Sequence, residues 1–153
     1  MTHTGLEIRR ISQDLEGLLA DMFRKIKQSG EDKHFHPHPF DDETAHMIAN
    51  HGGKDLFYAV AGGEKILGYG MLRGWDAGYE IPSLGIIILK EARGTGLGKT
   101  LMYFLHAAAR HRGSSRIRLK VYPDNKAAVN LYKELGYVFD NEEDGQLVGI
   151  IEL

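Results

Sequence analysis

Two periodicities of apolar residues run along the chain and separate its strands from its helices. Alternation or a short apolar run, typical of strands, occupies residues 6–11, 56–61, 65–73, 79–89, 116–122, 137–140 and 147–153. Apolar positions three and four apart, typical of amphipathic helices, occupy residues 13–28, 41–50, 97–112 and 125–135. Glycines follow three of these segments, as expected at helix ends, at positions 30, 113 and 136.

The order of these elements predicts the architecture. Gly62-Gly63 is typical of a tight hairpin turn, and the antiparallel meander that it starts passes into a strand–helix–strand crossover. We therefore expect an α/β (α+β) fold with a mixed, mostly antiparallel sheet of seven strands flanked by four helices. Residues 1–153 have the length of a single domain and contain no repeat or linker.

Composition narrows the class of protein without identifying it. The net charge of −2 gives no broad basic surface, so neither nucleic acid nor an anionic membrane is expected as a partner. The absence of Cys excludes disulfides, thiol nucleophiles and cysteine-bound zinc. No apolar run is long enough to span a membrane and the first residues lack the pattern of a signal peptide, so we expect a cytoplasmic protein.

Residues 83–100 combine an apolar strand, a glycine-rich turn and a helix start. Backbone N–H groups and the positive end of the helix converge at such a turn, which makes it an anion site with phosphate as the usual ligand. The phosphate loop of nucleotide hydrolases would need Gly where Arg93 stands, and the dinucleotide pattern fails from both Gly94 and Gly96. The pattern present is Arg-x-x-Gly-x-Gly, from Arg93 to Gly98. Taken alone, this pattern is also compatible with an ordinary tight turn that binds no ligand.

A second motif lies at residues 121–137, where Asn125 is followed by small residues, by Tyr132 and by a closing Gly-Tyr pair. Together, in this order and separated by one helix and one strand, the two motifs resemble those of the GNAT superfamily of N-acetyltransferases. The predicted element order resembles the fold of that superfamily too. The resemblance is firmest over residues 56–140 and implies acetyl-CoA as the acetyl donor.

The resemblance also implies which residues hold the coenzyme. In the family, the strand before the glycine-rich loop binds the pantetheine arm through its backbone, the loop amides bind the pyrophosphate, and a residue at the start of the second helix contacts the arm. The positions that match are Ile86, Ile87, Ile88, Arg93, Gly94, Thr95, Gly96, Leu97, Gly98, Lys99 and Asn125. Asn125 is also in the position of an ordinary helix cap, a role that is compatible with contacting the coenzyme.

Two catalytic residues are implied by the same comparison. Tyr132 matches the general acid that protonates the departing thiolate, with a core aromatic residue as the alternative. A base must deprotonate the amine, and Glu80 is the candidate because family members often carry Glu on this strand, with a solvated Glu as the alternative. The family also places a backbone N–H, at a bulge in its fourth strand, against the developing oxyanion.

His34, His36 and His38 alternate in a proline-containing loop. Alternate side chains of an extended segment point the same way, so a metal site has to be considered. We predict no metal, because the family chemistry needs none and the prolines restrict the ligands. In the family this loop borders the acceptor pocket, so we expect Phe35, His36 and His38 to bind the acceptor, with a merely packed loop as the alternative.

The expected function is transfer of acetyl from acetyl-CoA to a primary amine of a small molecule, an amino sugar being one option, by direct attack on the thioester. Acetylation of a protein N-terminus or lysine is one alternative, and a non-catalytic acetyl-CoA-binding module is another. Because dimers are common in the family, a homodimer is a further open option.

Overall fold

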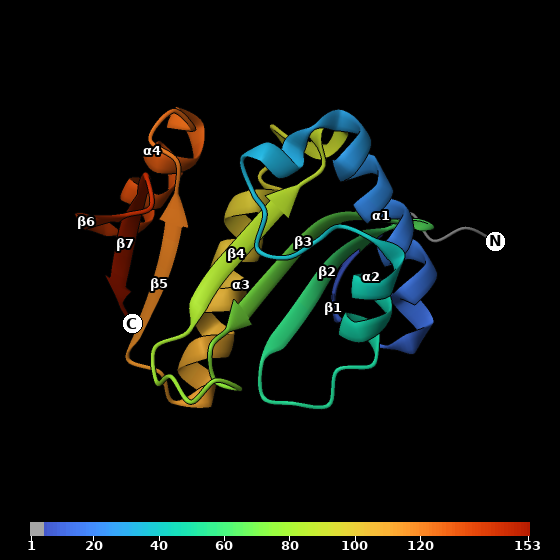
Figure 1. Cartoon of the computed structure of the whole chain (residues 1–153), viewed down its shortest axis with the longest axis horizontal. Helices are drawn as coiled ribbons and strands as arrows, with labels where there is room; N and C mark the ends of the chain where they lie inside the picture. Colours follow the sequence, from blue (N-terminus) through green and yellow to red (C-terminus); the bar gives the residue numbers. More distant parts are fainter. Residues whose placement is uncertain (1–4) are drawn as a thin grey trace.

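The computed structural model describes residues 5–153 and shows one mixed sheet between two layers of helices (Figure 1). The strands are β1 (Leu6–Arg10), β2 (Leu56–Gly62), β3 (Lys65–Arg73), β4 (Ser83–Ile88), β5 (Arg116–Val121), β6 (Val138–Glu143) and β7 (Gln146–Glu152). The α-helices are α1 (Glu16–Ser29), α2 (Asp42–Ala49), α3 (Leu97–Arg112) and α4 (Lys126–Leu135). Strands follow the order β1-β2-β3-β4-β5-β7-β6, and every neighbouring pair is antiparallel except β4 and β5.

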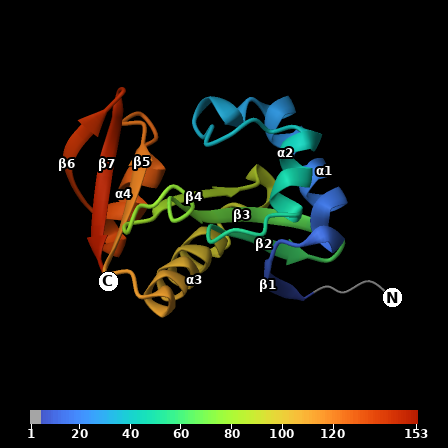
Figure 2. The same cartoon turned by 60° about the horizontal axis from the view of Figure 1, so that its bottom comes forward.

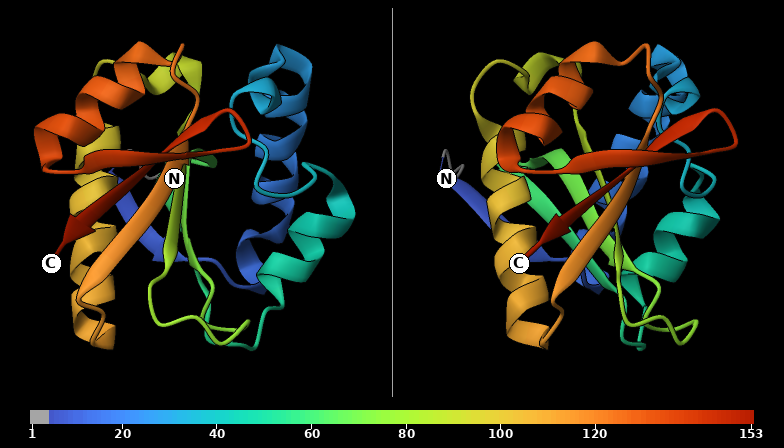
Figure 3. Two further views of the ribbon diagram at one scale, coloured as in Figure 1. Left: turned by 60° about the vertical axis from the view of Figure 1, so that its left-hand side comes forward. Right: turned by 90° about the vertical axis from the view of Figure 1, so that its left-hand side faces the viewer.

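Helices α1 and α2 cover one face of the sheet, and α3 covers the other (Figures 2 and 3). Alternation along β3 explains the two cores, because Tyr69 and Met71 pack with α1 whereas Leu72 packs with α3. Between them, Gly70 allows α3 to approach the sheet, since a Cβ there would lie 3.0 Å from Leu105 Cδ1. No helix within residues 5–153 combines the length and apolar character that a membrane span requires.

Most element boundaries lie within a few residues of those predicted, and three differences matter for the site or the sheet. The strand predicted at 79–89 is shorter, because residues 74–82 form a loop in which the Tyr79 N–H donates to the Gly74 carbonyl at 2.9 Å. Gly62 pairs with Lys65 inside the hairpin, which moves the tight turn by one residue to Gly63 and the position after it. The strand predicted at 137–140 continues to Glu143.

Candidate active site

The parallel strands β4 and β5 diverge in the middle of the sheet (Figure 1), and residues of both strands and of the elements around them line a cleft there. They pair at one register position, Ser83 with Arg118, whereas the pairing of β4 with β3 continues as far as Ile88 with Gly68. The later part of β4 therefore keeps unpaired backbone groups on the edge that faces β5. An extended ligand can pair with such an edge as an added strand would.

Two cavities occupy this cleft and meet on β4. The larger, of about 620 Å³, is lined by residues 86–88 of the strand together with the starts of α3 and α4. The smaller, of about 280 Å³, is lined by residues 83–85 together with β3 and β5. His34 and Phe35 line both cavities, so the boundary lies at the Gly85–Ile86 peptide, beneath the loop that follows α1.

The glycine-rich turn forms one end of the larger cavity. Gly94 (φ 77°) and Gly96 (φ 85°) adopt the left-handed conformation, which favours glycine. The first backbone bond of α3 is donated by Thr100 to the Gly96 carbonyl at 3.0 Å, so the N–H groups of residues 97–99 have no acceptor within the helix. They form an anion site with the positive end of the helix.

Ten of the eleven predicted coenzyme residues line the larger cavity, and Thr95 does not. The Thr95 hydroxyl instead donates to the Ala92 carbonyl at 2.7 Å and holds the turn. Asn125 lines the cavity and also caps α4, since its side-chain oxygen accepts from the Ala128 N–H at 3.3 Å. Its two predicted roles are therefore compatible.

Arg93 is held in place by two contacts. Its Nε donates to the Ile88 carbonyl at 3.0 Å, and its guanidinium forms an ion pair with Glu31. Glu31 also lines the larger cavity, a position that the sequence motifs do not reveal, because it lies on the loop after α1. A carboxylate thus stands beside the anion site.

Tyr132 projects from α4 into the larger cavity, with only 8% of its surface exposed. Burial raises the pKa of Tyr132 to about 12, which keeps the phenol protonated at neutral pH. Among residues 5–153, no group forms a hydrogen bond with this hydroxyl, whereas the buried Tyr69 and Tyr137 hydroxyls bond to His38 and His106 at 3.0 and 2.8 Å. The Tyr132 proton is thus free to be donated into the cavity.

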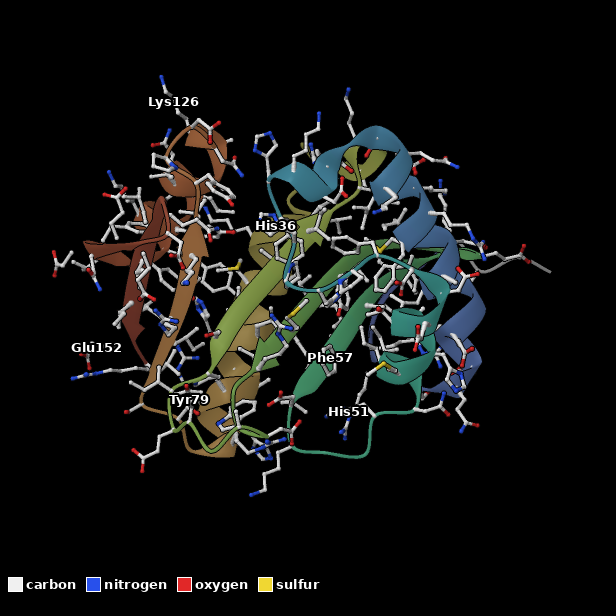
Figure 4. The ribbon with its side chains drawn as sticks, viewed as in Figure 1. His36, His51, Phe57, Tyr79, Lys126 and Glu152 are labelled. Carbon is white, nitrogen blue, oxygen red and sulfur yellow. The ribbon has the colours of Figure 1, made fainter. Side chains whose placement is uncertain are left out.

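The smaller cavity lies under the histidine loop, and Figure 4 shows His36 where this loop crosses β4. Phe35 packs on Gly85, where a Cβ would lie 3.0 Å from the ring. His36 bridges the cleft, because its Nε2 lies 3.2 Å from the Tyr122 hydroxyl at the end of β5. The loop therefore forms one wall of the cavity, and Phe35 and His36, which we expect to bind the acceptor, both line it.

His38 lines neither cavity. Its Nδ1 lies 2.8 Å from the Pro39 carbonyl oxygen and its Nε2 lies 3.0 Å from the Tyr69 hydroxyl, within an aromatic cluster that includes Phe23 and Phe40. Desolvation lowers the pKa of His38. The structure thus gives this histidine a packing role. Within residues 5–153, no group of three His, Asp or Glu side chains is arranged to hold a metal.

Glu80 lies outside β4, on the exposed loop at 74–82, and lines neither cavity. Figure 4 shows the neighbouring Tyr79 in this loop, away from His36. β4 pairs with β3 without a register shift from Ser83 to Ile88, so this pairing does not contain the bulge that the family carries in its fourth strand. Divergence from β5, and not a bulge, exposes the backbone of β4 here.

Sequence reasoning missed three cations of the smaller cavity, which are Arg73, Arg118 and Lys120. Arg118 and Lys120 alternate along β5, which is also the pattern of a solvated strand face. The separate strand that carries Arg73 gives no sequence signal of a shared site.

Comparisons with known proteins agree with this geometry. The model of the Acetyltransferase (GNAT) family matches residues 16–137. Over 151 residues, covering 90% of this chain and 89% of the relative, the chain is 27% identical to thialysine N-epsilon-acetyltransferase of Mus musculus. The structure resembles the GNAT domain of S. lividans PAT (TM-score 0.83, 19% identity, 97% of this chain and 90% of that chain). It also resembles paia N-acetyltransferase of Thermoplasma acidophilum in complex with coenzyme A (TM-score 0.80, 16% identity, 97% and 99% of the two chains).

These likenesses confirm the fold expected from the sequence, and the family match covers both motifs of the candidate site. The chain belongs to the acetyltransferase (GNAT) family and is an acetyl-CoA-dependent N-acetyltransferase.

Proposed function

We propose that the protein transfers acetyl from acetyl-CoA to the primary amine of a small molecule. The observation that carries this proposal is the meeting of two cavities at the Gly85–Ile86 peptide. The smaller cavity, at about 280 Å³, is close to the lower limit of small-molecule sites. The mouse relative is named for acetylating the ε-nitrogen of thialysine, a small amine.

The coenzyme lies along β4 in this proposal. Its pyrophosphate takes the N–H groups of residues 97–99, and its pantetheine arm pairs with the free edge at residues 86–88, against the apolar side of α4. The thioester then lies at Gly85–Ile86, between Tyr132 and the mouth of the smaller cavity.

The chemistry is a direct attack. The amine lone pair forms a bond to the thioester carbon, the carbon–sulfur bond breaks, and the thiolate takes the proton of the Tyr132 hydroxyl. Backbone N–H groups on the open edge of β4 stabilise the oxyanion. We place the proton acceptor for the amine at His34, because this residue lines both cavities. Glu80 is the other candidate, and it would act through water from its loop.

Thiol release from acetyl-CoA, measured over matched panels of small amines and of peptides, tests the proposal. We expect turnover with small amines and weaker or no turnover with peptides. Turnover with peptides alone would favour the alternative acceptor, a protein N-terminus or lysine. Tight coenzyme binding without turnover of any amine would contradict the proposed reaction.

A further inference from the structure

The smaller cavity carries a concentration of positive charge that the chain as a whole does not share. Arg73, Arg118 and Lys120 line it, and none of the described residues that line it is acidic. The full sequence has a net charge of −2, so these cations are a local feature of the site. They come from two strands on either side of β4, which the fold brings together around one space.

One of the three cations has no counterion. Arg73 is half-buried and donates from Nη1 to the Pro37 carbonyl at 3.1 Å, but it forms no ion pair within residues 5–153. Arg118 and Lys120 share a single carboxylate, that of Glu143, at 2.5 and 3.5 Å. Three positive groups therefore face the cavity with one negative group behind them. A half-buried guanidinium without a carboxylate partner among the described residues is well suited to an anion.

We propose, on the basis of the function proposed above, that the acceptor is a primary amine that also carries an anionic group, a carboxylate or a phosphate, bound by Arg73 with Arg118 and Lys120. The anion lies at the β3–β5 end of the smaller cavity, and the amine reaches toward Gly85–Ile86. Polycationic amines are repelled by the same three side chains.

The positive charge has a second consequence for the reaction. An ammonium group near these cations loses its proton more readily, because like charges disfavour the charged form. The cavity thus increases the fraction of acceptor that is a neutral amine and able to attack.

Matched acceptors test the inference. We would compare ε-aminocaproate with its neutral amide, phosphoethanolamine with ethanolamine, and spermidine as a polycation, in the thiol-release assay with the full chain. We expect the anionic member of at least one pair to have a kcat/KM at least ~10-fold higher than its neutral partner, the range of one charged hydrogen-bonded contact. The pair that shows the difference distinguishes carboxylate from phosphate.

Variants locate the effect. Arg73→Gln should raise KM for the preferred anionic acceptor ~10-fold or more and change that for its neutral partner less than ~3-fold. Arg116→Gln is the matched control, because Arg116 lies on β5 but pairs with Glu152 outside the cavity. Arg73→Glu should shift the preference toward spermidine.

A preference for neutral or cationic amines in the wild type, or an equal loss for both members of a pair in Arg73→Gln, would overturn the inference while leaving acetyl transfer intact. Absence of turnover with every amine would instead contradict the proposed function. In that case, calorimetry of ε-aminocaproate and phosphoethanolamine binding in the presence of coenzyme A tests the anion site separately from turnover. We expect at least one of the two probes to bind, and Arg73→Gln to weaken that binding. If neither probe binds, the inference is overturned.

Discussion

At the scale of single residues, three buried tyrosines differ in what their hydroxyls contact. Those of Tyr69 and Tyr137 bond to buried or half-buried histidines, whereas that of Tyr132 faces the larger cavity with no partner among residues 5–153. Among the described residues, this hydroxyl is not one of the fully buried polar atoms that lack a partner, so it opens onto the cavity. A protonated phenol that opens onto the cavity is what a proton donor to a ligand requires.

Replacing Tyr132 with Phe removes that donor and keeps the ring. We expect kcat to fall by roughly 10²–10⁴, with little change in the Kd for acetyl-CoA. Tyr137→Phe is the control, because it removes a buried hydroxyl that bonds to His106 outside the cavity. That change should lower the free energy of unfolding by about 1–3 kcal/mol and leave kcat near the wild-type value. Equal losses of stability and coenzyme binding in Tyr132→Phe would identify it as a core aromatic residue instead.

The proton acceptor can be assigned with two further substitutions. His34→Ala should lower kcat/KM for the amine by about 10²-fold, since His34 lines both cavities. Glu80 lies on the exposed loop and is not the base in this assignment, so Glu80→Gln should change kcat/KM by less than ~3-fold. A large loss of kcat/KM in Glu80→Gln together with a small loss in His34→Ala would identify Glu80 as the base instead.

At the scale of elements, the site depends on how the turn between β4 and α3 presents its backbone. Gly94 and Gly96 hold left-handed conformations, and α3 then begins with three free N–H groups. In the proposed binding mode this turn lies against the pyrophosphate, so a side chain there should affect binding separately from stability.

Gly94→Ala and Gly145→Ala form a matched pair for this turn. Both glycines have φ 77° and neither has an atom within 4 Å of a new Cβ, but only Gly94 lines the larger cavity. Each change should cost about 1–2 kcal/mol of unfolding free energy through backbone strain. Only Gly94→Ala should also raise the Kd for coenzyme A, measured by calorimetry. Equal affinities in the two variants would show that the pyrophosphate does not approach this turn.

The elements themselves are largely predictable from sequence, because each depends on local periodicity and glycine punctuation. The coenzyme residues were expected from the family resemblance, which rests on two motifs that are each continuous along the chain, and ten of the eleven line one cavity. The acceptor side of the site is not predictable from the sequence in this way. Its cations come from β3 and β5, and alternation along the loop does not show that His38 turns into the core while His36 turns to Tyr122. Glu80 was expected on this strand because the predicted strand began at Tyr79, whereas β4 begins at Ser83.

At the scale of the whole molecule, the two cores on either side of the sheet contain titratable side chains in their neutral forms. Burial raises the pKa of Tyr69, Tyr132 and Tyr137 above the ordinary value of 10.0. Burial also lowers the pKa of His38 and His106 below the ordinary value of 6.5. Folding therefore favours the uncharged form of all five groups.

The sign of each shift sets the pH dependence of stability. The tyrosines stabilise the fold below about pH 10, and this contribution is lost as the pH rises, because the unfolded chain ionises first. The histidines stabilise it above about pH 6.5, and this contribution is lost as the pH falls, because the unfolded chain binds protons first. Urea unfolding across this range should give a maximum of unfolding free energy near pH 8. A value that does not change between acid and alkaline conditions would contradict this burial.

A crystal structure with coenzyme A bound would show whether donor and acceptor meet where β4 and β5 diverge. We predict the pyrophosphate on the N–H groups of residues 97–99, the pantetheine arm along residues 86–88, and the sulfur within hydrogen-bonding distance of the Tyr132 hydroxyl at the mouth of the smaller cavity. A coenzyme whose sulfur lies away from Tyr132 and from the Gly85–Ile86 peptide would contradict the account.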